Sequence, residues 1–534
     1  MLPHIPMYSL LPELILRSAA QRADATALRY KGQSLAYGEL AAAIERVAHG
    51  LLGLGLGRAE RVAVYLPKQF ETVAAYFGAS LAGGVFVPVN MLLKADQVAH
   101  ILRDCNVRVL ITSAERLSEL SGVLSECPDL KTLVIVGGAA PAAPPGGKTQ
   151  VTWKELLDAP RAPAHRVIDV DMAAILYTSG STGKPKGVVL SHRNMMTGAK
   201  SVAQYLQNVA EDRLLAVLPF SFDYGFSQLS TAFLVGASVT LMDYLLARDV
   251  IVMAAKERIT GLAGVPPLWM QLAEQTWPAE ARDSLRYITN SGGVMPRATL
   301  DRLRAALPGT RPFLMYGLTE AFRSTFLPPE EVDRRPDSMG KAIPNAEILV
   351  VRPDGNACDA DEPGELVHRG ALVALGYWND PHKTAERFKP LPGQDPGLVL
   401  TELAVWSGDT VRRDAEGFLY FIGRRDEMIK TSGYRVSPTE VEEVLYATGL
   451  VRDAVAVGVS HPNLGQAVVV VAAPAEGRVA DSEALLLQCR QRLPTFMVPL
   501  HVEWRDSLPR NPNGKFDRPR LAGELRQLFG GATK

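Results

Sequence analysis

The run TSGSTGKPK, from Thr178 to Lys186, gathers glycine, hydroxyl and lysine residues between two apolar, strand-like segments. Backbone amides beside glycine, with hydroxyl and ammonium groups, form a concave donor surface that suits phosphate oxygens. The phosphate loop G-x-x-x-x-G-K-[ST] does not fit, because Thr178 replaces the first glycine and Pro185 follows Lys184. A mobile linker is the alternative. The candidate phosphate ligands are Thr178, Ser179, Gly180, Ser181, Thr182, Gly183, Lys184 and Lys186.

Three further residues have side chains suited to nucleotide chemistry. Glu320, in MYGLTEA, offers an anionic oxygen to a hard cation that bridges phosphates. Asp409, in WSGDTV, is an acceptor with two oxygens. Lys515, in NPNGKFDR, offers a single ammonium group. The alternatives are a helix N-cap at Thr319 with a first-turn glutamate, a charged surface turn, and a solvated lysine.

In their order along the chain, these motifs resemble those of the AMP-forming adenylating ligases. This superfamily comprises acyl- and aryl-CoA synthetases, amino-acid adenylation domains and luciferases. The resemblance runs from about Ser34 to Arg518, and LPFSFDYGFSQLSTAFLVG is most similar to the exosortase-associated AMP-forming acyl-CoA ligases. It implies an ATP- and Mg²⁺-dependent enzyme that converts a carboxylic acid to acyl-AMP and pyrophosphate. The acyl group then passes to a phosphopantetheine thiol of CoA or of a carrier protein.

The resemblance also assigns roles to single residues. The turn at Ser291, Gly292 and Gly293 would lie along adenine, although alone it could be an ordinary turn. The resemblance implies that Tyr316, beside Gly317, stacks on adenine, that Thr319 contacts the α-phosphate and that Glu320 binds Mg²⁺. It further implies that Asp409 binds the ribose and that Arg424 contacts the ribose and phosphate. Lys186 and Lys515 would be catalytic. The small domain would turn about Asp426, and Lys430, Gly433 and Arg435 would face the site for thiol transfer.

The acid pocket is less sharply marked. Many acyl-CoA ligases have a histidine in the segment Leu218–Gly225, where this chain has Asp223. The Phe-Asp pattern is similar to that of amino-acid adenylation domains, whose aspartate binds the substrate ammonium. A helix N-cap at Asp223 is the alternative. Other expected pocket walls, which could equally be ordinary core, are Phe222, Tyr224, Val265, Pro266 and Trp269.

Composition narrows the function classes. Lysine plus arginine and aspartate plus glutamate number 57 each, so bulk charge does not indicate nucleic-acid binding. We expect no membrane span, because the apolar run Ala467–Ala473 stops at Pro474. Four widely separated cysteines favour buried thiols in a reducing cytoplasm rather than a metal site. A monomer or homodimer is expected. A non-catalytic nucleotide-binding regulator and a luciferase-type oxygenase are the competing functions.

The elements that position these residues alternate between helical and strand-like patterns. We expect a helix over Ser34–Leu54, a strand over Arg61–Leu66, a helix over Glu71–Ala82 and strands over Val85–Val89 and Val107–Ile111. This alternation predicts an α/β fold with layered, parallel-rich sheets in a large N-terminal domain, residues 1–424. Residues 425–534 are predicted to form a small, mobile α+β domain. Its first helix would start with Ser437 as N-cap and Glu440 as the capping-box partner.

Overall fold

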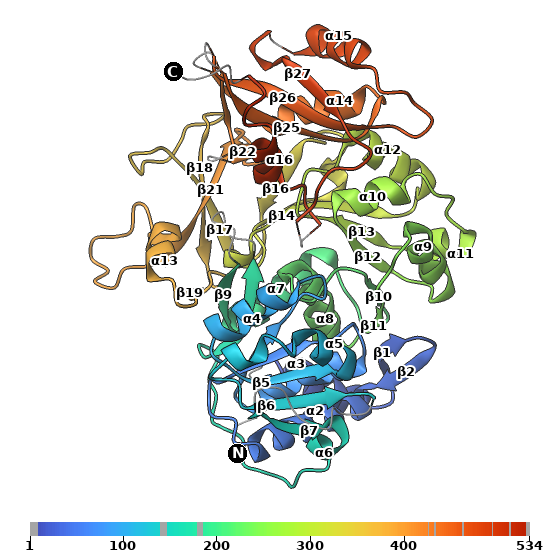
Figure 1. The fold of residues 1–534 in the computed structure, drawn as a ribbon, viewed down its shortest axis with the longest axis vertical. Helices are drawn as coiled ribbons and strands as arrows, with labels where there is room; N and C mark the ends of the chain where they lie inside the picture. The colour runs from blue at the N-terminus through green and yellow to red at the C-terminus, as the bar shows by residue number, and fades with distance from the viewer. Residues whose placement is uncertain are drawn as a thin grey trace.

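The computed structural model describes residues 9–138, 147–178, 185–424, 427–431, 434–461, 464–493, 495–511 and 514–529, with the side chains of Lys430, Tyr434 and Arg435 left aside. The chain is built in layers, with the N-terminal strands at one end and a small C-terminal unit at the other (Figure 1). The predicted α/β class with a smaller C-terminal α+β unit is confirmed. Among the described residues, none of the helices combines the length and apolar composition that a bilayer span requires.

The first sheet carries the segments that flank the glycine-rich run. Its strands, in spatial order, are β19 (Gly376–Tyr377), β9 (Lys186–Ser191), β8 (Met172–Thr178), β4 (Val85–Pro88), β3 (Arg61–Tyr65), β5 (Val107–Ser113), β6 (Thr132–Val136) and β7 (Thr149–Thr152). The strands from β8 to β7 in this order run parallel, as near-continuous Val, Ile and Leu runs predict. Strand β9 pairs antiparallel with both β8 and β19.

The second, larger sheet changes from parallel to antiparallel along its width. Its parallel part contains β1 (Thr26–Tyr30), β11 (Ser238–Leu241), β10 (Arg213–Ala216), β12 (Gly261–Gly264), β13 (Tyr287–Asn290) and β14 (Arg311–Tyr316). It continues antiparallel through β15 (Thr325–Leu327), β16 (Ser338–Ala342), β22 (Leu419–Arg424), β21 (Leu403–Arg413), β18 (Gly364–Gly370) and β17 (Ala346–Val351), with β20 (Phe388–Pro390) beside β21. The sequence analysis did not anticipate this antiparallel part.

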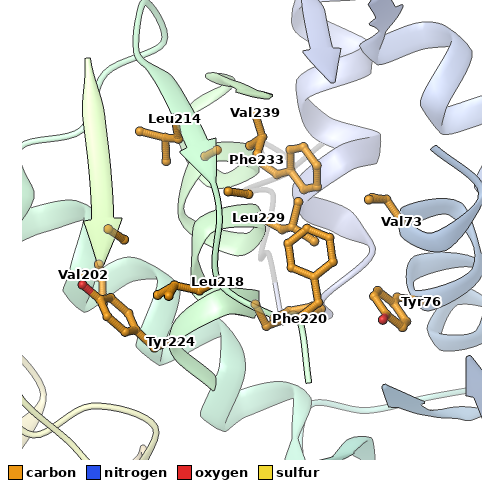
Figure 2. Packing of buried hydrophobic residues seen from close by; sticks show 14 of the residues in the cluster. Val73, Tyr76, Val202, Leu214, Leu218, Phe220, Tyr224, Leu229, Phe233 and Val239 are labelled. Carbon is orange, nitrogen blue, oxygen red and sulfur yellow. The ribbon is translucent and has the colours of Figure 1, made fainter. Parts of the chain in front are cut away.

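Helices fill the space between the sheets. Helix α3 (Phe70–Leu81) is buried along most of its length and packs against α2 (Tyr37–Gly53). Val73 and Tyr76 of α3 face a cluster of Phe220, Leu229 and Phe233 (Figure 2). Helix α8 (Asp223–Val235) supplies part of that cluster, so the residue that begins α8 is anchored by the core. The remaining helices of this region are α1 (Glu13–Arg22), α4 (Ala95–Asp104), α5 (Ala114–Leu120), α6 (Trp153–Leu157), α7 (His192–Leu206), α9 (Ala247–Lys256), α10 (Pro266–Leu272), α11 (Ala279–Ser284), α12 (Arg297–Ala306) and α13 (Pro381–Arg387).

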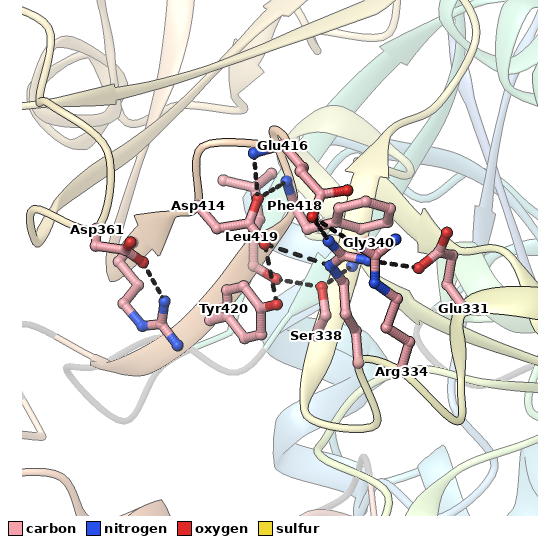
Figure 3. Close-up of polar contacts among 12 residues, drawn as sticks. Glu331, Arg334, Ser338, Gly340, Asp361, Asp414, Glu416, Phe418, Leu419 and Tyr420 are labelled. Atoms are coloured by element: carbon pink, nitrogen blue, oxygen red, sulfur yellow. Dashed lines mark hydrogen bonds and ion pairs between the residues drawn. The ribbon is translucent and has the colours of Figure 1, made fainter.

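Side-chain contacts lock the antiparallel strands that carry Asp409 and Arg424. Ser338 Oγ in β16 donates a hydrogen bond to the Leu419 carbonyl of β22 at 2.8 Å (Figure 3). Asp414, in the turn between β21 and β22, accepts from Phe418 N at 2.8 Å (Figure 3). The register of this pair sets Asp409 directly opposite Arg424.

The helix expected over Ser34–Leu54 is wrong in its first turn. Residues Gln33–Ala36 form β2, which pairs antiparallel with β1 through a turn with positive φ at Lys31 and Gly32. Strand pairing satisfies the backbone groups of Ser34 and Leu35, so the helix starts at Tyr37. The other elements expected up to residue 113 agree with the structure within one or two residues.

The C-terminal unit carries hydrophobic clusters of its own on both faces of its sheet. Its elements are β23 (Ile429–Thr431), β24 (Tyr434–Val436), α14 (Pro438–Ala447), β25 (Val451–His461), β26 (Gly465–Pro474), α15 (Ser482–Arg492), β27 (His501–Trp504) and α16 (Arg518–Glu524). Ser437 caps α14 as predicted, by accepting from Glu440 N at 3.4 Å. The reciprocal Glu440 side-chain bond of a capping box is not formed among the described residues. Asp426 lies outside them, so the hinge stays a prediction.

Candidate active site

The glycine-rich run connects two paired strands. Thr178 ends β8 and Lys186 begins β9, and the two residues lie opposite each other in the ladder. Ser191 then caps α7, accepting from Asn194 N at 3.1 Å. The candidate phosphate ligands Ser179, Gly180, Ser181, Thr182, Gly183 and Lys184 lie outside the described residues.

Glu320 and Lys186 meet at Tyr377. The Tyr377 hydroxyl donates to Glu320 Oε1 at 2.5 Å and accepts from Lys186 Nζ at 2.9 Å. Lys186 Nζ lies 3.9 Å from Glu320 Oε1. Burial alone would raise the pKa of Glu320, but the Arg387 guanidinium, the Tyr377 hydroxyl and Lys186 hold it below its ordinary value. Burial lowers the pKa of Lys186, and Glu320 opposes this shift. We call Tyr377, Glu320 and Lys186 the glutamate triad.

Two members of this neighbourhood, Tyr377 and Arg387, were missed by the sequence analysis. Tyr377 stands on β19, nearly 200 residues after its partner strand β9, and only the antiparallel pairing brings it to Lys186. Arg387 ends α13. No motif around either residue predicted its position, because both depend on long-range pairing.

Asp409 forms a second arrangement of the same kind with Tyr316 and Arg424. The Tyr316 hydroxyl donates to Asp409 Oδ2, and Arg424 Nε lies 3.3 Å from Asp409 Oδ1. Burial and the neighbouring Asp409 carboxylate raise the pKa of Tyr316 well above its ordinary value, so Tyr316 remains a donor. Asp409 Oδ1 is buried and has no hydrogen-bond partner. We call these three residues the aspartate triad.

Lys515 reaches this region from the C-terminal unit. A Cβ built on Gly292, which has φ +82°, would lie 3.7 Å from Lys515 Cε. Lys515 is exposed by surface area, yet protein surrounds its ammonium closely enough that burial lowers its pKa. Arg424 lowers this pKa further, whereas Asp223 and Asp409 raise it. The sequence-predicted Gly292, Lys515, Asp409 and Asp223 therefore gather in one place.

Asp223 does not cap a helix, so the N-cap interpretation is wrong. It is the first residue of α8, and the N-cap position belongs to Phe222, which makes no side-chain cap. Asp223 Oδ1 instead accepts from Thr319 Oγ1 at 3.1 Å. Burial raises the pKa of Asp223, while Arg323, Thr319 and Lys515 act in the opposite direction. The N-cap interpretation of Thr319 also fails, since Thr319 lies inside the short 3-10 turn η3 (Thr319–Ala321).

The other expected pocket walls divide into two groups. Val265 and Pro266 lie against the turn, 3.5 Å and 3.1 Å from Cβ atoms built on Gly292 and Gly293. Tyr224 and Trp269 are buried, and both donate a hydrogen bond to the carbonyl of Thr289. The Tyr224 hydroxyl lies 2.8 Å and Trp269 Nε1 3.2 Å from that oxygen. These two residues therefore support β13.

The predicted thiol-transfer segment is only partly described. Lys430 and Arg435 lie opposite each other in the β23–β24 pair, and their side chains are outside the described set. Gly433 is also outside it. Their roles stay predictions.

These residues fit a nucleotide and a magnesium ion. Asp409 Oδ1 faces Arg424 but accepts no hydrogen bond from the described residues, so it is an acceptor that a ribose hydroxyl could satisfy. Gly292 has no side chain at the turn, so its backbone is open to close approach. Glu320 is a single, ionised oxygen donor. No group of three or more His, Cys, Asp or Glu side chains able to hold a metal occurs among the described residues. A single carboxylate suits Mg²⁺, which is typically held by one or two carboxylates together with substrate phosphates.

Comparison with known proteins gives two family matches. The family described as AMP-binding enzyme matches residues 15–378, and the AMP-binding enzyme C-terminal domain matches residues 440–515. The chain is 30% identical over 522 residues to feruloyl-CoA synthase of an Amycolatopsis species, covering 96% of this chain and 98% of that protein. It is also 30% identical over 540 residues to the L-proline–[L-prolyl-carrier protein] ligase of Pseudomonas fluorescens, covering 97% and 99%.

A solved structure supports the same architecture. The structure of a benzoate CoA ligase from Burkholderia xenovorans superposes with a TM-score of 0.84 at 27% identity. The superposition covers 97% of this chain and 100% of the other. Both domains of the fold are therefore included in the likeness.

Proposed function

We propose that this chain, which belongs to the AMP-binding enzyme family, is an ATP-dependent, AMP-forming ligase that joins a carboxylic acid to a phosphopantetheine thiol. The observation that carries this proposal is the convergence of Lys515, Gly292, Asp409 and Asp223 around one point. CoA is the favoured acceptor, because the feruloyl-CoA synthase it resembles is named for that thiol. Loading of a carrier protein is the second candidate, favoured by the equal likeness to the prolyl-carrier ligase and by Asp223.

Activation of the acid follows from the charges in the site. A free carboxylate is a poor acyl donor, and its attack on the α-phosphorus of ATP releases pyrophosphate and leaves an acyl-adenylate. The Lys515 ammonium, beside Gly292, would bridge the carboxylate and the α-phosphate as negative charge develops. Thr319 and Arg424 would orient the phosphate, and Asp409 Oδ1 would accept from the ribose.

Magnesium would be held by Glu320, where it would neutralise charge on the phosphate oxygens. The glutamate triad keeps this carboxylate ionised and fixes its orientation. Thr178 and Lys186, at the two ends of the glycine-rich run, lie on the strands that lead to the β- and γ-phosphates in this proposal.

Thiol transfer requires a different surface near the same adenylate. In the present arrangement Lys515 faces the site from the C-terminal unit. We propose that this unit turns about Asp426 after pyrophosphate leaves, so that the segment containing Lys430, Gly433 and Arg435 replaces Lys515. We place the enzyme in the cytoplasm, where ATP is supplied and its four free, buried cysteines stay reduced.

Acid-dependent exchange of labelled pyrophosphate into ATP tests this function. We expect exchange with at least one acid from a panel of fatty, aryl, dicarboxylic and amino acids. The variant Glu320→Gln should lose it, because the amide cannot hold Mg²⁺ as a carboxylate does. Glu330→Gln is the matched control, since Glu330 is exposed and pairs with Arg311 at 3.6 Å on the surface. Binding of ATP with no exchange for any acid would instead indicate a nucleotide-binding regulator.

A further inference from the structure

Arg323 is a buried cation whose charge the protein does not neutralise by contact. Its side chain is 1% exposed, and its Nε and Nη2 atoms have no hydrogen-bond partner. Nη1 donates to Ser291 Oγ at 3.4 Å, and the guanidinium carbon lies 4.6 Å from the centre of the Tyr224 ring. It forms no ion pair with a carboxylate of the described residues. One long hydrogen bond and a cation–π contact do not replace lost hydration, because Nε and Nη2 still lack an acceptor among the described residues.

The backbone holds Arg323 in this position at a conformational cost. Phe322 adopts φ +55°, which is unusual for a residue other than glycine, and its ring packs where a Cβ on Gly198 would clash at 2.3 Å. A Cβ built on Gly317 would lie 3.2 Å from Arg323 Cα and 3.4 Å from its Cδ. The strained turn and the glycine together direct the Arg323 side chain beneath the segment between Tyr316 and Thr319.

The same position places Arg323 beside the acid rather than beside the phosphates. Its hydrogen-bond partner Ser291 directly precedes Gly292, over which Lys515 lies. Arg323 and Lys515 both act electrostatically on Asp223. In the proposed function Lys515 meets the carboxylate that is activated. Arg323 is therefore left as a second cation near Asp223, without a carboxylate partner among the described residues.

We propose that Arg323 determines substrate specificity by binding a second carboxylate of the acid. The substrate class is then a small dicarboxylic acid, either unsubstituted or bearing an ammonium group that Asp223 faces. A planar guanidinium with two unpartnered nitrogens suits a carboxylate, because the two groups match as a pair of parallel donors and acceptors. This inference rests on the proposed function, because it concerns the acid used in the same reaction.

Pyrophosphate exchange with matched acid pairs tests it. Succinate is compared with butyrate, and glutamate with norvaline, since each pair differs by one terminal carboxylate. In the wild type we expect kcat/KM to be about 10- to 100-fold higher for the better dicarboxylic member than for its partner, the effect of a charge-assisted hydrogen bond. Arg323→Met should remove this preference, and Arg323→Lys should retain part of it. Whether the glutamate or the succinate pair responds distinguishes the two substrate types.

A binding measurement separates specificity from structure. The preferred dicarboxylic acid alone should raise the melting temperature of the wild type and not that of Arg323→Met. Arg311→Met is the control, because Arg311 also lies over an aromatic ring, 5.4 Å from Phe313, but is half-exposed and pairs with Glu330. If Arg323→Met lowers kcat/KM equally for both members of each pair, or if the wild type prefers the monocarboxylic acids, the inference is overturned while the proposed function stands. Failure of every acid in wild-type exchange would overturn the proposed function itself.

Discussion

The residues proposed to bind the nucleotide and those proposed to bind the acid differ in how their charges are neutralised. On the nucleotide side, the glutamate triad and the aspartate triad repeat one arrangement: a tyrosine hydroxyl donates to a buried carboxylate that also faces a cation. On the acid side, Asp223 accepts from Thr319 Oγ1, and Arg323 has no carboxylate partner among the described residues. Each carboxylate of the first side is therefore paired with a protein cation, whereas the buried cation of the second side is not paired with a carboxylate of the described residues.

This difference indicates where each side gains its selectivity. Such a ligase uses ATP whichever acid it activates. The protein can therefore orient the groups that bind ATP in advance, which reduces reorganisation during the reaction. The acid varies between enzymes, and a buried group without a partner favours the acid that supplies one. Discrimination against acids lacking the second carboxylate would then come from the unpaired Arg323.

Removing Lys515 has the largest expected effect, because its ammonium interacts electrostatically with Asp223 on the acid side and with Asp409 on the nucleotide side. Lys515→Ala should lower the rate of acyl-adenylate formation about 10²- to 10³-fold, the usual cost of losing one donor to developing charge. Transfer from supplied acyl-adenylate to the thiol should be nearly unchanged. Single-turnover measurements of the two steps provide the test, with the surface variant Lys131→Ala as control. Equal losses in both steps of a folded variant would contradict the division of work between Lys515 and the segment after Asp426.

The nucleotide side was largely predictable from sequence because its residues lie in short motifs. Gly292, Glu320, Asp409 and Lys515 each stand within a local run that resembles a motif of the adenylating ligases, and the resemblance implies their roles. Long-range folding then brings those runs together, as the hydrogen bond from the Tyr316 hydroxyl to Asp409 shows. The parallel strands were likewise predictable, since two-sided burial leaves continuous apolar runs.

The acid side and Tyr377 were not predictable in the same way. Tyr377 acts through the pairing of β19 with β9, and a sequence pattern does not encode such a distant register. The role of Arg323 depends on a positive φ at Phe322 and on the burial of its side chain, neither of which the sequence analysis detected. Asp223 was recognised with two interpretations, of which the bounds of α8 contradict the N-cap, while binding of a substrate ammonium stays a prediction.

A smaller effect is expected from breaking one triad. Tyr377→Phe removes the hydroxyl that joins Glu320 to Lys186, and we expect adenylation to fall about tenfold through weaker Mg-ATP binding. The ratio of kcat/KM between dicarboxylic and monocarboxylic acids should not change, because the acid side is untouched. The control is Tyr205→Phe, a buried tyrosine whose hydroxyl donates to the Met315 sulfur at 3.0 Å. A changed acid preference in Tyr377→Phe would show that the two sides are coupled.

The smallest expected effect is a shift in the pH dependence of adenylation. Burial and Arg424 lower the pKa of Lys515, so this ammonium loses its proton at a lower pH than an ordinary lysine. Because the charged form is required, adenylation should decline as pH rises through that lowered pKa, by at most about tenfold per pH unit. Lys515→Arg should move the alkaline decline to higher pH, even if its rate at neutral pH is reduced. The preference for dicarboxylic acids should stay constant over the same range, since arginine keeps its charge. A preference that declines together with the rate would mean that Lys515, and not Arg323, holds the second carboxylate.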